Sequence, residues 1–238
     1  EHDAWEIWDV TQRVIKNVFK KINEPVHGVA ITNQRETTVA WDRETGKPLH
    51  RAIVWQCRRT AKRMENLSED EKKIIKQKTG LPADAYFSAS KMEWLLQNVD
   101  TVKQAAAKNS LCLGTIDAWV LFCLTQGKSC ATDASNASRT LLMNIHTGKY
   151  DPELLNMFGI DENCLPKIQA SNANFGKLNI PGIDSHPPIH AILGDQQAAL
   201  FAQCGNEKNK LKNTYGTGLF ICASTGTKAI ETESLLTT

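Results

Sequence analysis

An aspartate at a strand-to-helix junction is the residue of this chain best placed for acid–base chemistry. The apolar run IHAILG (189–194) predicts a buried strand, and Asp195 follows it at the start of a predicted helix, DQQAALF (195–201). In open α/β sheets such junctions carry ligand-binding groups. The position also suits a plain helix N-cap, whose carboxylate accepts a backbone N–H two or three residues on. Both roles can hold, because a carboxylate at a helix N-terminus stays ionised, as a general base must.

A glycine-rich turn is the second candidate. In Tyr215-Gly216-Thr217-Gly218 the two glycines would let the backbone approach a ligand, and Thr217 offers a hydroxyl and an N–H that suit a phosphate oxygen. An ordinary hairpin turn would have the same composition. Taken alone, the turn therefore leaves both interpretations open.

The adjacent charges Arg35 and Glu36 directly follow a predicted strand. A guanidinium donates and a carboxylate accepts hydrogen bonds, so the two together suit neighbouring hydroxyls of a polyol. Trp55 and Tyr86 could supply apolar walls for the CH faces of such a ligand. The alternatives are a pair of solvated turn charges and aromatic rings that only fill a core.

The elements that must position these residues alternate between strand and helix patterns. Apolar residues at helical spacing predict an amphipathic helix over the first twenty residues. Short apolar runs predict strands, and Asn, Gly, Pro and Ser predict a surface connection over 170–190. The expected strands are 26–32, 37–42, 52–56, 189–194 and two runs within 213–226. The expected helical segments are 57–99 with a break at 80–84, 115–124 and 195–201, and residues 151–166 are expected to be a helix and a loop, with Asp151 as N-cap.

Composition excludes several classes of protein. Of the 238 residues, 41% are hydrophobic and 23% charged, which is ordinary for a globular protein and argues against wholesale disorder. A formal charge of +2 is too small for nucleic acid to be the main partner. No apolar stretch approaches the roughly 18 to 20 residues of a membrane span. The start, EHDAWEIWDV, resembles neither a signal peptide nor a transit peptide.

The seven cysteines are widely spaced and form no CxxC pair or Cys/His cluster. An odd number at such spacings predicts neither a disulfide framework nor a zinc site. We therefore expect reduced thiols, as in a cytosolic protein, and assign no cysteine a catalytic role.

Several longer strings of residues resemble a known family. ITNQRETTVAWDRETGKPLHRAIVWQCRRT, AYFSASK, GTIDAW, TDASNASRT, GDQQAALF and KNTYGTG occur in this order, and the resemblance runs from residue 1 to about 226. They are similar to the glycerol-phosphorylating members of the FGGY carbohydrate kinases, within the actin-like ATPase superfamily. The fold that this implies is α/β, with ribonuclease H-like domains. Residues 1–203 would be most of the first domain without its opening strands, and 204–238 the start of the second.

The resemblance also implies roles for particular residues. The implied reaction is transfer of the ATP γ-phosphoryl group to glycerol with Mg²⁺, with Asp195 as general base. No residue is expected to bind the metal directly, although Asp195 could reach it through water. Gly216 and Thr217 match a phosphate-binding turn for ATP. The residues implied to hold glycerol are Arg35, Glu36, Trp55, Tyr86, Asp195, Gln196 and Phe220.

Some expectations concern the protein as a whole. The family opens with a DQGTTS-type phosphate loop that does not occur here, and the chain lacks an initiator Met, so we expect a piece of a longer product that is inactive alone. The loop near 175–190 does not match the one that binds fructose 1,6-bisphosphate in some bacterial members. The full-length protein is expected to be a cytoplasmic homo-oligomer that binds glycerol, ATP and ADP, without nucleic acid.

Two rival functions remain open. A kinase of the same family acting on xylulose or gluconate would share the GDQ and GTG strings, although Arg35, Glu36 and Trp55 favour a small triol. A non-catalytic binding or scaffold protein is the rival from another class, and the intact Asp195 argues against it.

Overall fold

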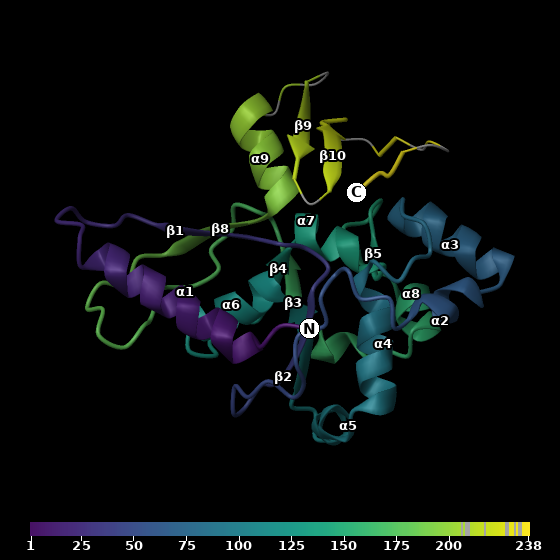
Figure 1. Cartoon of the computed structure of the whole chain (residues 1–238), viewed down its shortest axis with the longest axis horizontal. Helices are drawn as coiled ribbons and strands as arrows, with labels where there is room; N and C mark the ends of the chain where they lie inside the picture. Colours follow the sequence, from purple (N-terminus) through teal and green to yellow (C-terminus); the bar gives the residue numbers. More distant parts are fainter. Residues whose placement is uncertain (206, 208–209, 217, 227–228, 231, 233–234) are drawn as a thin grey trace.

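The computed structural model describes residues 1–205, 207, 210–216, 218–226, 229–230, 232 and 235–238. It has the expected α/β character, with helices packed around short sheets (Figure 1). The helices are α1 (Ala4–Phe19), α2 (Ala61–Glu65), α3 (Glu69–Thr79), α4 (Ser88–Asn98), α5 (Asp100–Ala107), α6 (Ile116–Leu124), α7 (Ala134–Ala137), α8 (Pro152–Met157) and α9 (Asp195–Cys204), with 3-10 turns η1 (Ser138–Thr140) and η2 (Glu162–Cys164). The strands are β1 (Val29–Asn33), β2 (Thr38–Asp42), β3 (Leu111–Thr115), β4 (Ala131–Asp133), β5 (Met143–Asn144), β6 (Lys149–Tyr150), β7 (Lys167–Gln169), β8 (Ile189–Gly194), β9 (Leu211–Tyr215) and β10 (Leu219–Ala223).

The strands pair across long sequence distances. β1 pairs with β8 and β4 with β7 in parallel, whereas β2–β3, β5–β6 and β9–β10 are antiparallel. The β1–β8 register ends with Asn33 opposite Gly194. Parallel strands end at the same edge of a sheet, so the segments that follow β1 and β8 emerge side by side.

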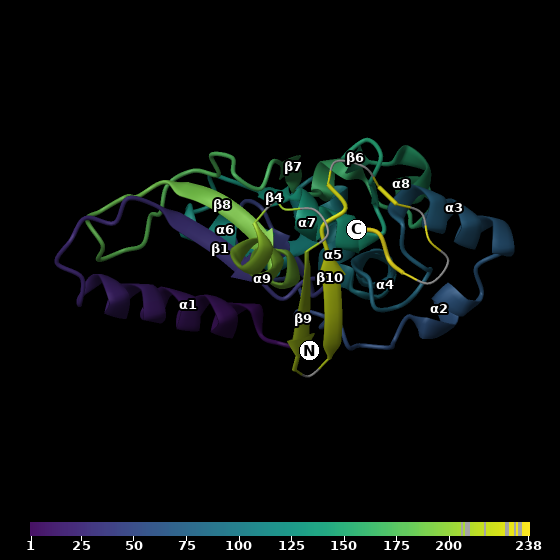
Figure 2. The same ribbon diagram turned by 90° about the horizontal axis from the view of Figure 1, so that it is seen from above.

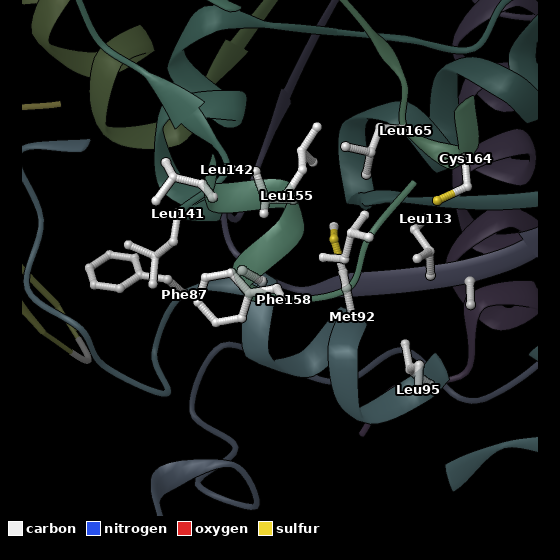
Figure 3. Close-up of a cluster of buried hydrophobic side chains, with 14 of the residues drawn as sticks. Phe87, Met92, Leu95, Leu113, Leu141, Leu142, Leu155, Phe158, Cys164 and Leu165 are labelled. Atoms are coloured by element: carbon white, nitrogen blue, oxygen red, sulfur yellow. The ribbon is translucent and has the colours of Figure 1, made fainter. Parts of the chain in front are cut away.

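The β2–β3 pair separates two hydrophobic cores. Because successive side chains of a strand point to opposite faces, Ala40, Leu111 and Leu113 face one core, while Trp41 and Cys112 face the other. The first core packs against α3, α4, α5 and α8, and Figure 3 shows part of it. The second packs against α1, α6 and the β1–β8 pair, with α1 alongside the two strands (Figure 2).

Local sequence signals account for the helix ends. Asp3 accepts from the backbone of Trp5 and caps α1, and Asp151 caps α8 as expected. Ser68 and Glu71 form a reciprocal capping box at the start of α3. Gly80 ends that helix in the left-handed conformation, at φ 71°, which glycine adopts without steric cost.

Two expectations about the fold are wrong, one for residues 52–56 and one for residues 170–190. Residues 52–56 form no strand: Ala52 makes only an isolated bridge to His2 and Ile53 only one to Thr38, whereas β2 pairs with β3 along its whole length. The 170–190 segment is not merely a surface connection, because its apolar side chains fill the second core despite its Asn- and Pro-rich composition. They are Phe175, Leu178, Ile180 and Ile183.

The last elements stand apart from the two cores. In Figure 1, α9, β9 and β10 lie above the rest of the fold. β9 and β10 form the expected hairpin around the glycine turn. Among the described residues, no helix is both long and apolar enough to cross a membrane.

Candidate active site

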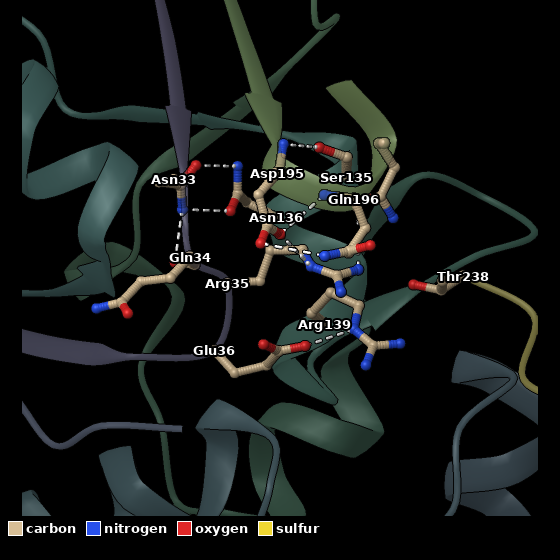
Figure 4. Close-up of polar contacts among 12 residues, drawn as sticks. Asn33, Gln34, Arg35, Glu36, Ser135, Asn136, Arg139, Asp195, Gln196 and Thr238 are labelled. Carbon is tan, nitrogen blue, oxygen red and sulfur yellow. Dashed lines mark hydrogen bonds and ion pairs between the residues drawn. The ribbon is translucent and has the colours of Figure 1, made fainter. Parts of the chain in front are cut away.

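The candidate site lies where β1 and β8 end together. Arg35 and Glu36 follow β1, and Asp195 and Gln196 open α9 directly after β8 (Figure 4). The two sequence strings that carried the strongest chemical signals therefore meet in space, although one lies near each end of the chain.

Asp195 is the first residue of α9 but not its cap. The N-cap position is occupied by Gly194, so no side chain caps the helix. The Asp195 carboxylate accepts from the adjacent Gln196 N–H at 2.8 Å. The expected cap interaction with residues two or three further on is therefore wrong. The side chain of Asp195 is 46% exposed, so its carboxylate remains open to a ligand.

Arg35 is buried beside this carboxylate. Its Nε lies 3.3 Å from Asp195 Oδ1, and its Nη1 donates to Gln197 Oε1 at 3.2 Å. The contact with Asp195 is an ion pair without hydrogen-bond geometry, which leaves the buried Nε without an acceptor among the described residues. A Cβ at Gly194 would lie 2.6 Å from Arg35 Cδ, so glycine before Asp195 makes room for the guanidinium.

Glu36 is also buried, and it pairs with a different residue from the one beside it in sequence. Arg139 Nε donates to Glu36 Oε1 at 2.6 Å, and both side chains are at most 6% exposed. The interpretation of Arg35 and Glu36 as solvated turn charges is therefore wrong. Glu36 has φ 62°, an uncommon conformation for a non-glycine residue, and Ser88 Oγ donates to its carbonyl at 3.0 Å.

Trp55 and Tyr86 form one aromatic wall. Their ring centroids are 5.4 Å apart in an edge-to-face arrangement, and the Arg139 guanidinium lies 5.8 Å from the Tyr86 ring. Burial, followed by the negative charge of Glu36, raises the pKa of Tyr86. Tyr86 thus belongs to the same group of residues as the two ion pairs.

A buried lysine holds the turn that carries Tyr86. Lys91 Nζ donates to the carbonyls of Ala85, Tyr86 and Phe87 at 2.6, 2.7 and 2.9 Å. Burial lowers the pKa of Lys91 to about 8. The ammonium takes the place of water for three consecutive carbonyls and fixes the backbone on which Tyr86 sits.

Gln196 links the site to the β9–β10 hairpin. Its Nε2 donates to Asp195 Oδ2 at 3.4 Å, and its Oε1 accepts from the buried Lys212 Nζ at 2.7 Å and from Thr214 Oγ1 at 3.4 Å. Phe220 is connected to this group through the hairpin, where it is paired with Thr214. Among the described residues, no hydrogen bond, ion pair or ring contact joins Phe220 to the ion-paired residues.

The glycine turn can be described only in part. The backbone N–H of Gly216 donates to Gly218 O at 3.2 Å, and a Cβ at Gly216 would meet only that oxygen, at 3.9 Å. Neither packing nor a left-handed conformation therefore demands glycine at 216, which leaves room for a ligand close to the backbone. Thr217 lies outside the described residues.

The string TDASNASRT (132–140) supplies the residues that sequence reasoning left without a role. Besides Arg139, it holds Asn136, whose side-chain amide exchanges two hydrogen bonds with that of Asn33, at 2.8 and 3.2 Å. It also holds Ser135, whose Oγ accepts from Gly194 N at 2.8 Å. The string thus fastens the ends of β1 and β8 together. Its place among the matching strings was the one available signal.

Taken together, these residues present a half-exposed carboxylate, a buried guanidinium whose Nε has no acceptor in the described part of the chain, a separate ion pair that is buried on both sides, and an aromatic wall. Such a set suits a small neutral ligand with several hydroxyl groups. Within the described residues there is no cluster of three or more His, Cys, Asp or Glu side chains that could hold a metal ion.

Comparison with known proteins places this geometry in context. The model of the FGGY family of carbohydrate kinases, N-terminal domain, matches residues 1–202. A glycerol kinase of Dichelobacter nodosus (strain VCS1703A) is 46% identical over 240 residues, which cover 99% of this chain and 48% of that protein. A glycerol kinase of Shewanella pealeana (strain ATCC 700345 / ANG-SQ1) is also 46% identical, over 100% of this chain and 49% of that protein.

Solved structures agree with the sequence relatives. The crystal structure of Plasmodium falciparum glycerol kinase with ADP matches with a TM-score of 0.88 and 36% identity, over 98% of this chain and 48% of that one. The ligand-bound xylulose kinase of Lactobacillus acidophilus matches with a TM-score of 0.79 at 22% identity, over 92% of this chain and 44% of that one, which shows the fold alone. The chain spans about half the length of the curated relatives that it matches.

Proposed function

Because the chain belongs to the FGGY family of carbohydrate kinases, we propose that it forms the glycerol-binding part of a kinase that transfers the ATP γ-phosphoryl group to glycerol. The observation that carries the proposal is the pair of Asp195 and Arg35. A half-exposed carboxylate lies beside a buried guanidinium nitrogen that has no hydrogen-bond acceptor among the described residues. A substrate hydroxyl that contacts both groups from one side would accept from Arg35 and give its proton to Asp195.

In the proposed mechanism, Asp195 accepts the proton of a terminal glycerol hydroxyl while the oxygen attacks the γ-phosphorus of ATP in line and ADP leaves. General base catalysis of this kind contributes about 10²- to 10⁴-fold. The position of Asp195 supports the role: it is not the N-cap residue of α9, so its carboxylate is not used to cap the helix.

The remaining residues would select and orient the triol. Arg35 would donate to one hydroxyl and Glu36 would accept from another, while Trp55 and Tyr86 face the CH groups and Gln196 holds the Asp195 carboxylate. Fixing which hydroxyl faces Asp195 provides the proximity contribution to catalysis. The paired rings of Trp55 and Tyr86 would occupy space that a longer sugar needs, which supports the proposal of glycerol over xylulose or gluconate.

Gly216 and Thr217 would contact the phosphates of ATP. The open space around Gly216 supports this assignment. Mg²⁺ would neutralise phosphate charge, and it would be held chiefly by the phosphates themselves, with Asp195 reaching it through water. Phosphoryl transfer depends on several protein contacts that position the phosphates and stabilise their charge. We therefore propose that the chain alone has no turnover.

The wider assignments belong to the same proposal. A domain boundary at residues 203–204 is supported by the end of the family match at residue 202, and it lies in the last turn of α9. The actin-like arrangement of two domains around a cleft, the cytoplasmic location and the homo-oligomeric assembly are supported by the family resemblance.

The test uses a hybrid kinase in which this chain replaces the region that it matches in the Dichelobacter nodosus glycerol kinase. A coupled assay for glycerol 3-phosphate should show turnover by the hybrid and none by the chain alone. Activity toward xylulose or gluconate in place of glycerol would favour the first rival function. Glycerol binding without any phosphoryl transfer would favour a binding protein.

A further inference from the structure

Two cysteines that the proposed reaction does not use lie in contact with each other. The Sγ atoms of Cys112 and Cys130 are 3.8 Å apart. Cys112 is fully buried on β3, and Cys130, just before β4, is partly buried. The segment between them contains all of α6, so the contact joins the entrance and the exit of one helix.

The charges around this pair make the two sulfurs unlike. The hydrogen bond from Cys130, together with the guanidinium of Arg43, lowers the pKa of Cys112 to about 7. The same neighbour, Cys112, raises the pKa of Cys130. Arg43 is anchored at the site because its Nη2 donates to Asn163 O at 2.7 Å. Near neutral pH Cys112 therefore exists partly as thiolate while Cys130 stays a thiol, and these are the two forms needed to make a disulfide.

We propose that Cys112 and Cys130 are an oxidation site at which a peroxide converts the two thiols into an intramolecular disulfide. The peroxide enters from the side of Cys130, which is partly exposed. The Cys112 thiolate then attacks one peroxide oxygen, the O–O bond breaks, and Cys112 becomes a sulfenic acid while hydroxide leaves. The sulfur of Cys130 then attacks the Cys112 sulfur, and the sulfenic oxygen leaves as water with the Cys130 proton. Two electrons pass from the thiols to the peroxide.

The geometry demands little movement for this reaction. A disulfide has an S–S distance of about 2.05 Å, so the sulfurs must approach by less than about 2 Å from their contact. The bond would close the loop from 112 to 130 around α6, which carries the buried Asp117. A cross-link of this kind stabilises mainly by restricting the unfolded chain, so the oxidised protein should unfold at a higher temperature.

The test is performed on the purified reduced chain under native conditions. Hydrogen peroxide is added and removed, the protein is then unfolded in urea with N-ethylmaleimide so that every remaining thiol is blocked, and peptides are mapped by mass spectrometry without reduction. We expect a linked peptide pair containing Cys112 and Cys130, five blocked cysteines in place of the seven of the reduced chain, and full reversal by dithiothreitol. The rate should rise about tenfold between pH 6 and pH 8, because the thiolate fraction of Cys112 rises by that factor.

Matched variants separate this site from general thiol oxidation. Cys112→Ser and Cys130→Ser should each abolish the linked peptide, whereas Cys123→Ser, which alters a thiol on α6 itself, should leave it unchanged. Arg43→Gln should slow the reaction at pH 7, and Arg13→Gln, at an exposed position of α1, should not. Absence of the linked peptide from the wild-type chain, linkage through other cysteines, or linkage that occurs only in urea would overturn the proposal. None of these outcomes depends on whether the chain binds glycerol.

Discussion

Arg35 Nε lies 3.3 Å from Asp195 Oδ1, although the two residues are 160 positions apart in the sequence. The parallel pairing of β1 with β8 produces this contact, because it brings the residues after Asn33 and Gly194 to one edge. Gly194 completes it, since any larger residue would occupy the position of the Arg35 side chain. The central proposal, that Asp195 acts as a base on a hydroxyl held by Arg35, follows from this geometry.

Replacing Arg35 tests the binding side of this relationship. Arg35→Ala in the hybrid kinase should weaken glycerol binding by about 1.5 to 3 kcal/mol, which corresponds to roughly 10- to 150-fold in the dissociation constant, because a hydrogen bond from a charged donor is lost. Calorimetric titration with glycerol measures the change. Arg13→Ala, at an exposed position of α1, is the control. An unchanged dissociation constant for Arg35→Ala would mean that the guanidinium does not contact the substrate.

Glu36 and Arg139 form a buried ion pair, so the effects of replacing them on the free energy of unfolding should depend on each other. Arg139→Met leaves the Glu36 carboxylate buried without a partner, so it should lower the free energy of unfolding by about 3 kcal/mol or more. The double variant Glu36→Gln/Arg139→Met should lose clearly less than the sum of the two single variants. Urea unfolding of all four proteins gives the coupling energy. Additive losses would show that the two side chains do not depend on each other.

Asp117 should make the stability of the chain depend on pH. Burial raises the pKa of Asp117 to about 6 from 3.8, although the hydroxyls of Thr115 and Thr132 donate to its carboxylate. A carboxyl whose pKa is raised on folding stabilises the fold while it is protonated, and this contribution is lost as the pH rises through the folded pKa. The loss should therefore fall between about pH 4 and pH 6.

Asp117→Asn isolates this effect from that of other carboxyl groups. Asn cannot ionise, and the neighbouring hydroxyls can reverse to accept from its amide. The free energy of unfolding of the variant relative to wild type should therefore increase from pH 4 to pH 6 and then level off. Urea unfolding at half-unit pH steps measures the difference. A difference that does not change with pH would contradict the assignment.

The sequence predicts those features whose residues are neighbours in the chain, and it fails for contacts between residues that are far apart in the chain. The junction at Asp195 was predicted because an apolar run and a helix start lie next to each other, and the structure confirms both elements. Arg139 was missed because its partner, Glu36, is 103 residues away, and no local pattern encodes that pairing. The 52–56 run has strand composition, but its neighbours offer only isolated bridges.

Composition misled where polar and apolar residues alternate irregularly. The segment 170–190 has many turn-forming residues, yet Phe175 and Leu178 are buried in the second core. Likewise, the conformation of Glu36, at φ 62°, cannot be read from its residue type, because glutamate seldom adopts it. Such features arise from tertiary packing, which a single sequence does not display.

The most direct test of the account is Asp195→Asn in the hybrid kinase. Asn keeps the size of the side chain and can still accept from the Gln196 N–H, but it cannot take a proton. The account predicts that turnover falls by at least about a hundredfold while the glycerol dissociation constant stays within a few-fold of the unmodified hybrid. Asp184→Asn, at an exposed aspartate of the 170–190 segment, should leave both unchanged. Turnover of Asp195→Asn within a few-fold of the unmodified hybrid would show that Asp195 is not the general base.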